Sequence, residues 1–254
     1  MKNILISPDS SKINWKAIAV YYVLACAISF PFFWWRHFNT DSWIDWKMIG
    51  FAKQWFIMWG VGISALVCYF LFRKSIEKTV SLGGTSWIKS LIFYFLPVFG
   101  LCTVGIEGLP FPVHVAPLVL SIVGFISILG EEIGWRGFLQ DSLKNVKPLP
   151  KYLIIAVLWE FWHIFVRTSS GEWYMIIVKI LAFGLGSFII SVILGKAIEK
   201  TKSLFVVVTL HAWIDILIEF GSTGTYIVFA CCIPVWIYMI LTWENKLTIF
   251  TSKK

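Results

Sequence analysis

Residues 113–136, VHVAPLVLSIVGFISILGEEIGWR, carry three ionisable side chains at the end of a long apolar run. A charge in the middle of a membrane helix costs roughly 2.5–3.5 kcal/mol, so these side chains need a compensating arrangement. Glu132 and Arg136 are four residues apart, the spacing of an intrahelical ion pair, whereas Glu131 projects about 100° away toward another face. The sequence therefore predicts an ion pair with a second carboxylate beside it. The alternative is a salt bridge where a helix ends at the membrane surface.

The composition of the whole chain is that of a membrane protein. Of the 254 residues, 58% are hydrophobic and only 14% are charged, against roughly 25% charged residues in soluble domains. The net charge of +8 would suggest nucleic-acid binding in a soluble protein, but here the basic residues cluster in short loops and report topology. The five cysteines lie inside apolar runs without a CxxC spacing, so we interpret them as packing residues.

Apolar runs long enough, or nearly long enough, to cross a bilayer recur along the chain. They lie at about 17–35, 54–72, 87–106, 113–143, 152–166, 174–195, 203–220 and 225–243. The sequence therefore predicts an all-α, polytopic membrane protein with about eight transmembrane helices. Because no internal repeat and no linker is visible, we expect a single integral membrane domain over residues 1–254.

The basic residues of the predicted loops indicate the orientation. The loops near 73–89, 144–151 and 196–202 are rich in lysine and arginine, and they fall on the same side as both termini. The loops on the other side carry few basic residues. The positive-inside rule therefore predicts a protein of the cell membrane with its N- and C-termini in the cytoplasm.

Two later apolar runs contain a histidine with polar neighbours. One reads Trp159-Glu160-Phe161-Trp162-His163, and the other reads His211-Ala212-Trp213-Ile214-Asp215. A lone histidine in a membrane helix is more often an interhelical hydrogen bonder than a catalyst. Here, however, Asp215 follows His211 by one turn on the same helix face.

The depths of these side chains agree with one another. Counted at about 1.5 Å per residue from the nearest cytoplasmic lysine, Glu131, His163 and His211 lie roughly 20, 18 and 13 Å into the membrane. We therefore expect three helices to bring a carboxylate, an imidazole and an imidazole with a carboxylate to one level.

Together these motifs resemble those of a known family. Glu131-Glu132-x-x-x-Arg136, then Trp159-x-x-x-His163, then His211-x-x-x-Asp215 is similar to the three-motif signature of the CPBP family (CAAX protease and bacteriocin-processing enzymes, also called Abi). That family includes the eukaryotic CAAX prenyl endopeptidase Rce1. The resemblance covers residues 115–220. Trp159 stands where phenylalanine is common in the family, and Asp215 stands where the prenyl proteases have asparagine.

The resemblance implies an intramembrane endopeptidase with a catalytic cavity inside the membrane. Its substrates would be membrane-embedded or lipidated peptides, as in CAAX processing, peptide maturation or bacteriocin self-immunity. The resemblance further implies that Glu131 and His163 activate a water molecule, while His211 and Asp215 stabilise the oxyanion. Elementary chemistry agrees, because a carboxylate removed from water is a stronger base. The side chains expected to support the site are Glu132, Arg136, Trp159 and Glu160.

This mechanism needs no cofactor, but a zinc ion is the alternative. Zinc accepts nitrogen and oxygen ligands, which would come from Glu131, His163, His211 and Asp215. Against this, no HExxH motif is present.

Two other classes of function stay open at this point. Buried glutamate and histidine side chains also form proton relays, so the chain could be a proton-coupled transporter or a lipid-modifying enzyme. Transporters commonly show inverted repeats, which this sequence lacks. A non-catalytic scaffold would not need all three motifs. The expected partners are the lipid bilayer and the substrate, without nucleic acid, and the sequence does not specify an oligomeric state.

Overall fold

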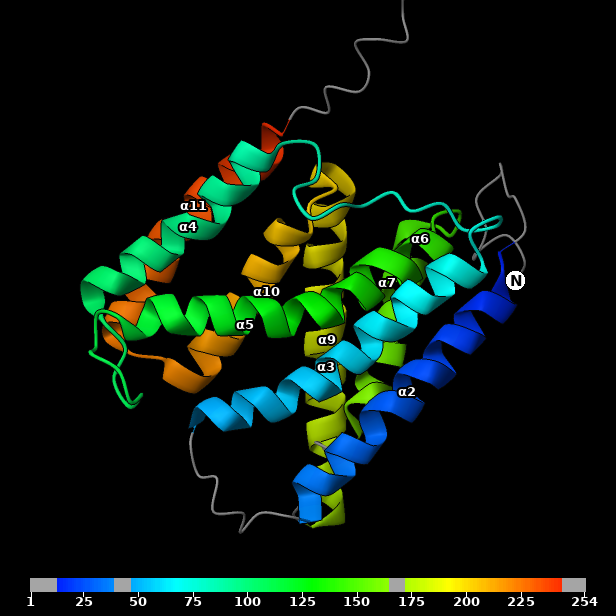
Figure 1. Cartoon of the computed structure of the whole chain (residues 1–254), viewed down its shortest axis with the longest axis horizontal. Helices are drawn as coiled ribbons and strands as arrows, with labels where there is room; N and C mark the ends of the chain where they lie inside the picture. The colour runs from blue at the N-terminus through cyan, green and yellow to red at the C-terminus, as the bar shows by residue number, and fades with distance from the viewer. Residues whose placement is uncertain (1–12, 39–46, 165–171, 244–254) are drawn as a thin grey trace, which may run out of the picture. The chain divides into compact units, whose positions relative to one another are not determined.

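The computed structural model describes residues 13–38, 47–164 and 172–243 (Figure 1). In these ranges the regular structure is helical, apart from one isolated bridge between Ser81 and Ser203. The helices are α2 (Trp15–Phe38), α3 (Lys47–Leu71), α4 (Trp87–Val104), α5 (Ala116–Glu132), η1 (Ile133–Leu139), α6 (Gln140–Ser142), α7 (Pro148–Trp162), α9 (Trp173–Thr201), α10 (Leu204–Phe220) and α11 (Thr223–Leu241). Because α5, η1 and α6 are continuous, each predicted apolar run corresponds to one helical segment, and the all-α prediction is confirmed.

Five of the described segments are long and apolar enough to cross a membrane. They are Trp15–Trp34, Trp87–Val104, Ala116–Ser142, Trp173–Thr201 and Thr223–Leu241. The apolar part of α3, Trp55–Leu71, is shorter, and α7 and α10 have 15 and 17 residues. A helix of 15 residues is about 22 Å long, which is less than the roughly 30 Å of the hydrocarbon core. The chain is thus a multi-pass membrane protein, and its two histidine motifs lie on its shorter helices.

The helices form two compact units. Unit 1 comprises residues 1–79 and 129–195, and unit 2 comprises residues 80–128 and 196–254. In unit 1, α2 packs against α3, and η1 contacts α3, α6 and α7. In unit 2, α4 packs against α10 and α11. Two of the three boundaries fall inside α5 and α9, and the third lies between residues 79 and 80, outside any helix. The expectation of one domain over residues 1–254 stays a prediction.

The core of unit 1 surrounds η1. Trp135 and Phe138 are fully buried and pack against Tyr21 of α2, with the Tyr21 and Trp135 ring centroids 5.9 Å apart. Gly62 allows α3 to approach α5 very closely. Any larger residue would clash, because a side-chain carbon on Gly62 would lie 2.6 Å from the carbonyl oxygen of Gly130. This crossing fixes the backbone immediately before Glu131.

Serine residues cap the N-terminal ends of α10 and α11 in unit 2. Ser203 caps α10, with its hydroxyl oxygen accepting a hydrogen bond of 3.4 Å from the Val206 backbone N–H. Ser222 caps α11 in the same way, accepting from Thr225 at 3.2 Å. A cap of this kind satisfies one of the backbone donors that a helix start leaves unpaired. It therefore fixes where α10, which carries His211, begins.

Candidate active site

The first motif lies where α5 passes into the π-helical segment η1. π-helical turns are rare in proteins, and those that do occur often lie at functional sites. The wider turn still pairs Glu132 with Arg136, whose Nη1 lies 3.0 Å from Glu132 Oε1, and both side chains are fully buried. The predicted intrahelical ion pair is therefore confirmed, and it lies in the protein interior instead of at an exposed helix end.

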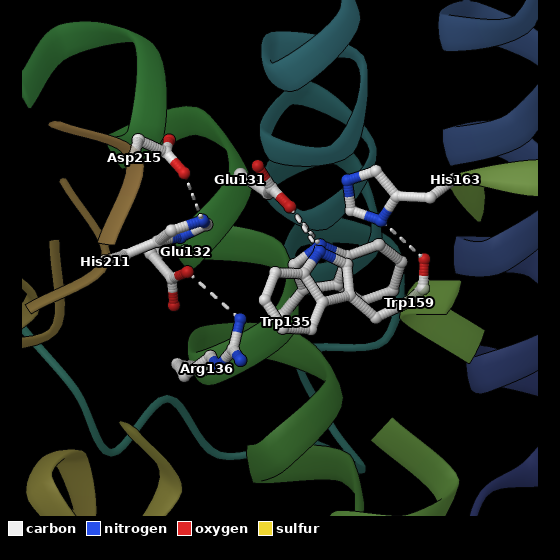
Figure 2. A network of polar contacts seen from close by, with 8 residues as sticks. All are labelled: Glu131, Glu132, Trp135, Arg136, Trp159, His163, His211 and Asp215. Atoms are coloured by element: carbon white, nitrogen blue, oxygen red, sulfur yellow. Dashed lines mark hydrogen bonds and ion pairs between the residues drawn. The ribbon is translucent and has the colours of Figure 1, made fainter. Parts of the chain in front are cut away.

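Glu131 is 1% exposed and binds two indole groups. Its Oε1 accepts a hydrogen bond of 3.2 Å from Trp135 Nε1 and a second hydrogen bond from Trp159 Nε1 (Figure 2). Trp135 lies one turn further along the same helical segment, while Trp159 comes from α7. Two donors on one oxygen fix the orientation of the carboxylate, because hydrogen bonds to an ionised group are short and strong.

Trp159 also contacts His163 and Arg136. Its carbonyl oxygen lies 3.0 Å from His163 Nδ1, and the Arg136 guanidinium carbon lies 4.4 Å from its ring centroid. A carbonyl oxygen can only accept, so Nδ1 carries the hydrogen and Nε2 is the acceptor nitrogen of the neutral ring. Figure 2 shows the imidazole turned so that Nε2 points toward Glu131.

His163 forms the C-cap of α7. Its ring packs between Trp159 and Trp162, with centroid separations of 5.6 and 4.8 Å and near-perpendicular planes for Trp162. The C-terminal end of a helix carries partial negative charge, which stabilises a positively charged imidazole. The ring is thus held in one orientation by two indoles and one hydrogen bond.

Glu160, predicted to support the site, lies on a neighbouring face of α7. It is 7% exposed, and its Oε2 accepts a hydrogen bond of 3.1 Å from Ser187 Oγ of α9. Glu160 therefore links α7 to α9.

The third motif lies in unit 2. His211 is 6% exposed, and its Nε2 lies 4.0 Å from Asp215 Oδ1. This separation fits an ion pair with a protonated ring but exceeds a hydrogen bond. The predicted neighbourhood of the two side chains on α10 is confirmed. That they meet Glu131 and His163 in one site stays a prediction, because the structure describes the two units separately.

The contacts of the tryptophans were not predicted from the sequence. Trp159 was expected to support the site as an aromatic residue in a phenylalanine position, and in the structure its N–H, its ring face and its carbonyl oxygen each contact a different motif residue. A signal was present, because a buried indole N–H normally finds an acceptor and Trp135 follows Glu131 at helical spacing.

A zinc site requires several metal-binding side chains to lie close together. Among the described residues of either unit, no three His, Cys, Asp or Glu side chains gather as a metal-binding group. Glu131 Oε1 is already bound by two N–H donors. The zinc-free mechanism therefore stays a prediction.

Comparison with protein families bears on all three motifs. Residues 113–217 match the family of type II CAAX prenyl endopeptidases called Rce1-like. Over these residues the chain is similar to that family. The match runs from just before α5 into α10, so it includes Glu131, His163 and His211 and confirms the resemblance to the CPBP family. No curated protein and no solved structure matches the chain. The Rce1-like match supports a peptidase of the CAAX protease type.

Proposed function

We propose that this Rce1-like protein is an intramembrane endopeptidase in which Glu131 and His163 activate a water molecule. The observation that carries the proposal is the double role of Trp159, which donates to Glu131 and accepts from His163. A general base must be oriented before it can take a proton efficiently. One tryptophan orients both groups here.

The proposed base is the second carboxylate oxygen of Glu131. Because the two indoles bind Oε1, we assign Oε2 to the water molecule. Oε2 accepts a proton as the water oxygen attacks the peptide carbonyl carbon, and His163 Nε2 accepts a hydrogen bond from the same water. General base catalysis of this kind typically contributes a factor of about 10² to 10⁴ in rate.

The second half of the proposed mechanism uses His211. When protonated, its ring can donate a hydrogen bond to the oxyanion, which is usually the largest single contribution in acyl transfer. Asp215 as an anion cannot donate, so at 4.0 Å we assign it to stabilising and orienting the His211 imidazolium. Glu131 then returns its proton to the leaving amine and the intermediate collapses. The substrate is a membrane-embedded or lipidated peptide that reaches the site from the bilayer.

The test uses the full chain reconstituted in lipid nanodiscs. Three peptides are offered: a farnesylated CAAX peptide, the same peptide without the farnesyl group, and a hydrophobic helical peptide. In ¹⁸O-labelled water, hydrolysis must introduce the label into the new carboxylate. Glu131→Gln should lower kcat by about 10² to 10⁴ while the melting temperature stays close to that of the wild type, since the amide oxygen can still accept from the indoles.

The matched control is Glu219→Gln, the same carboxylate-to-amide change at an exposed position of α10. It should leave both kcat and the melting temperature unchanged. Cleavage by Glu131→Gln at the rate of the wild type would exclude Glu131 as the base.

A further inference from the structure

An apolar crevice lies between α7 and α9 of unit 1. It has a volume of about 490 Å³, within the range of roughly 300–1,000 Å³ found for ligand pockets. Its walls include Val157 and Phe161 of α7, Ile164 just beyond the C-cap of α7, and Leu181, Leu185 and Phe188 of α9. Gly184 also lines it, and an added side-chain carbon there would meet no atom within 4 Å.

One ionisable side chain, Glu160, is present among the described residues that line this crevice. It is 7% exposed and is held by Ser187 Oγ at 3.1 Å, so its carboxyl group is fixed against the wall. An apolar channel with one carboxylate complements a side chain that has an aliphatic stem and a cationic head. Lysine and arginine have this character.

The crevice lies close to His163, one of the two residues proposed to activate water. Glu160 precedes His163 by three residues, which corresponds to a rise of about 4.5 Å and to neighbouring faces of one helix. Ile164, the residue after His163, lines the crevice itself. A side chain bound here therefore belongs to a substrate residue close to the bond that His163 addresses.

We propose that the crevice between α7 and α9 is a specificity pocket that selects a lysine or arginine next to the scissile bond of the peptide substrate. This inference rests on the proposed function. The Glu160 carboxylate binds the cationic head, and the apolar walls bind the stem.

The test uses sets of membrane peptides. Within a set the peptides are identical except at one position, which carries Lys, Leu, Ala or Glu, and each set places that position at a different residue of the cleaved segment. The measured quantity is the ratio of kcat/KM for the Lys and Leu peptides. The wild type should prefer Lys by at least tenfold, and Glu160→Gln should reduce this ratio at least tenfold. Glu160→Lys should reverse the preference toward Glu. The matched control Glu219→Gln should keep the ratio of the wild type.

A second variant keeps the inference testable if Glu160→Gln does not fold. Gly184→Leu fills open space in the crevice, so it should reduce kcat/KM at least tenfold more for the Lys peptide than for the Ala peptide. Equal reductions for the two peptides, or a wild type that cuts Leu peptides as well as Lys peptides, would overturn the specificity pocket. Those outcomes leave hydrolysis intact, whereas absence of any Glu131-dependent cleavage would overturn the proposed function itself.

Discussion

Trp159 uses three parts of one residue to contact three motif side chains. Its indole N–H binds Glu131, its ring face lies under Arg136, and its carbonyl oxygen accepts from His163. Phenylalanine in this position would keep the ring and the carbonyl but would lose the N–H donor. The aromatic change that looked conservative in the sequence therefore adds a hydrogen bond to the proposed base.

Replacing Trp159 with phenylalanine should thus affect catalysis more than stability. A hydrogen bond to a charged group contributes about 1.5–3 kcal/mol, so we expect kcat/KM to fall about 10- to 100-fold. The control is Trp162→Phe, which removes the same volume from a buried indole whose Nε1 has no hydrogen-bond partner among the described residues. The two variants should melt at similar temperatures in detergent. Equal activities of the two variants would contradict an orienting role for the Trp159 N–H.

The buried ion pair predicts a different behaviour for Arg136. Arg136→Ala leaves the Glu132 carboxylate in the interior without its 3.0 Å partner, which should cost about 3–5 kcal/mol of unfolding free energy. The double variant Glu132→Gln with Arg136→Met should recover most of this loss, since it removes both charges. Thermal unfolding in one detergent measures all three proteins. A single variant as stable as the wild type would show that the pair does not stabilise the fold.

Part of the candidate site could be predicted from the sequence. The Glu132–Arg136 pair and the Asp215–His211 pair followed from helical spacing, because both partners are on one helix. The contacts of Trp159 could not be predicted in this way, since Glu131 and Trp159 lie on different helices and their distance depends on how α7 packs against η1.

At the level of helices, the crossing of α3 and α5 determines where Glu131 lies. Gly62→Ala would bring a carbon to 2.6 Å from the Gly130 carbonyl oxygen, so α3 must move. Overpacking of this kind typically costs about 1–3 kcal/mol. The matched control is Gly186→Ala on α9, where an added carbon meets nothing within 4 Å and alanine should be neutral or stabilising by up to about 1 kcal/mol. A Gly62→Ala protein with unchanged melting temperature would contradict the tight crossing.

The positions of the helices were predicted well, whereas the winding of η1 was not. Apolar runs define helices because the bilayer requires every backbone group to be satisfied within its own segment. The π-helical turn depends on packing, since a side-chain carbon on Gly134 would lie 2.3 Å from Val61 and 2.4 Å from the Tyr21 hydroxyl. Both contacts come from other helices, so no local pattern around residues 133–139 could indicate them.

For the whole molecule, the distribution of basic residues leads to a test of topology. Lys74, exposed after α3, should lie on the cytoplasmic side, and Glu107, exposed between α4 and α5, should lie outside. Lys74→Cys should react with a membrane-impermeant maleimide only in inverted vesicles, and Glu107→Cys only in intact cells. The wild type provides the control, since its cysteines lie within helices. The opposite labelling pattern would reverse the predicted orientation of the termini, which themselves lie outside the described residues.

The zinc content of the purified protein tests whether the mechanism needs a metal. If water is activated by Glu131 and His163 alone, the purified protein should contain far less than one zinc per chain and keep its activity in chelator. Elemental analysis and a chelation series measure this. One tightly held zinc per chain, with activity lost on chelation and restored by zinc, would favour a metal site built from the motif residues.

The π-helical segment has a consequence for how this motif tolerates changes in length. An i→i+5 turn encloses one residue more than an α-helical turn, so η1 behaves as a single-residue insertion absorbed without a loop. Deleting one residue within 133–139 could therefore be compensated by ordinary α-helical winding, whereas ordinary winding with all seven residues kept would rotate every later position of the helix by about 100°. Phe138 and Leu139, fully buried now, would then change their phase relative to Glu131 and Glu132. The π-helical winding of this one turn therefore sets how the later positions of the helix are oriented relative to Glu131 and Glu132.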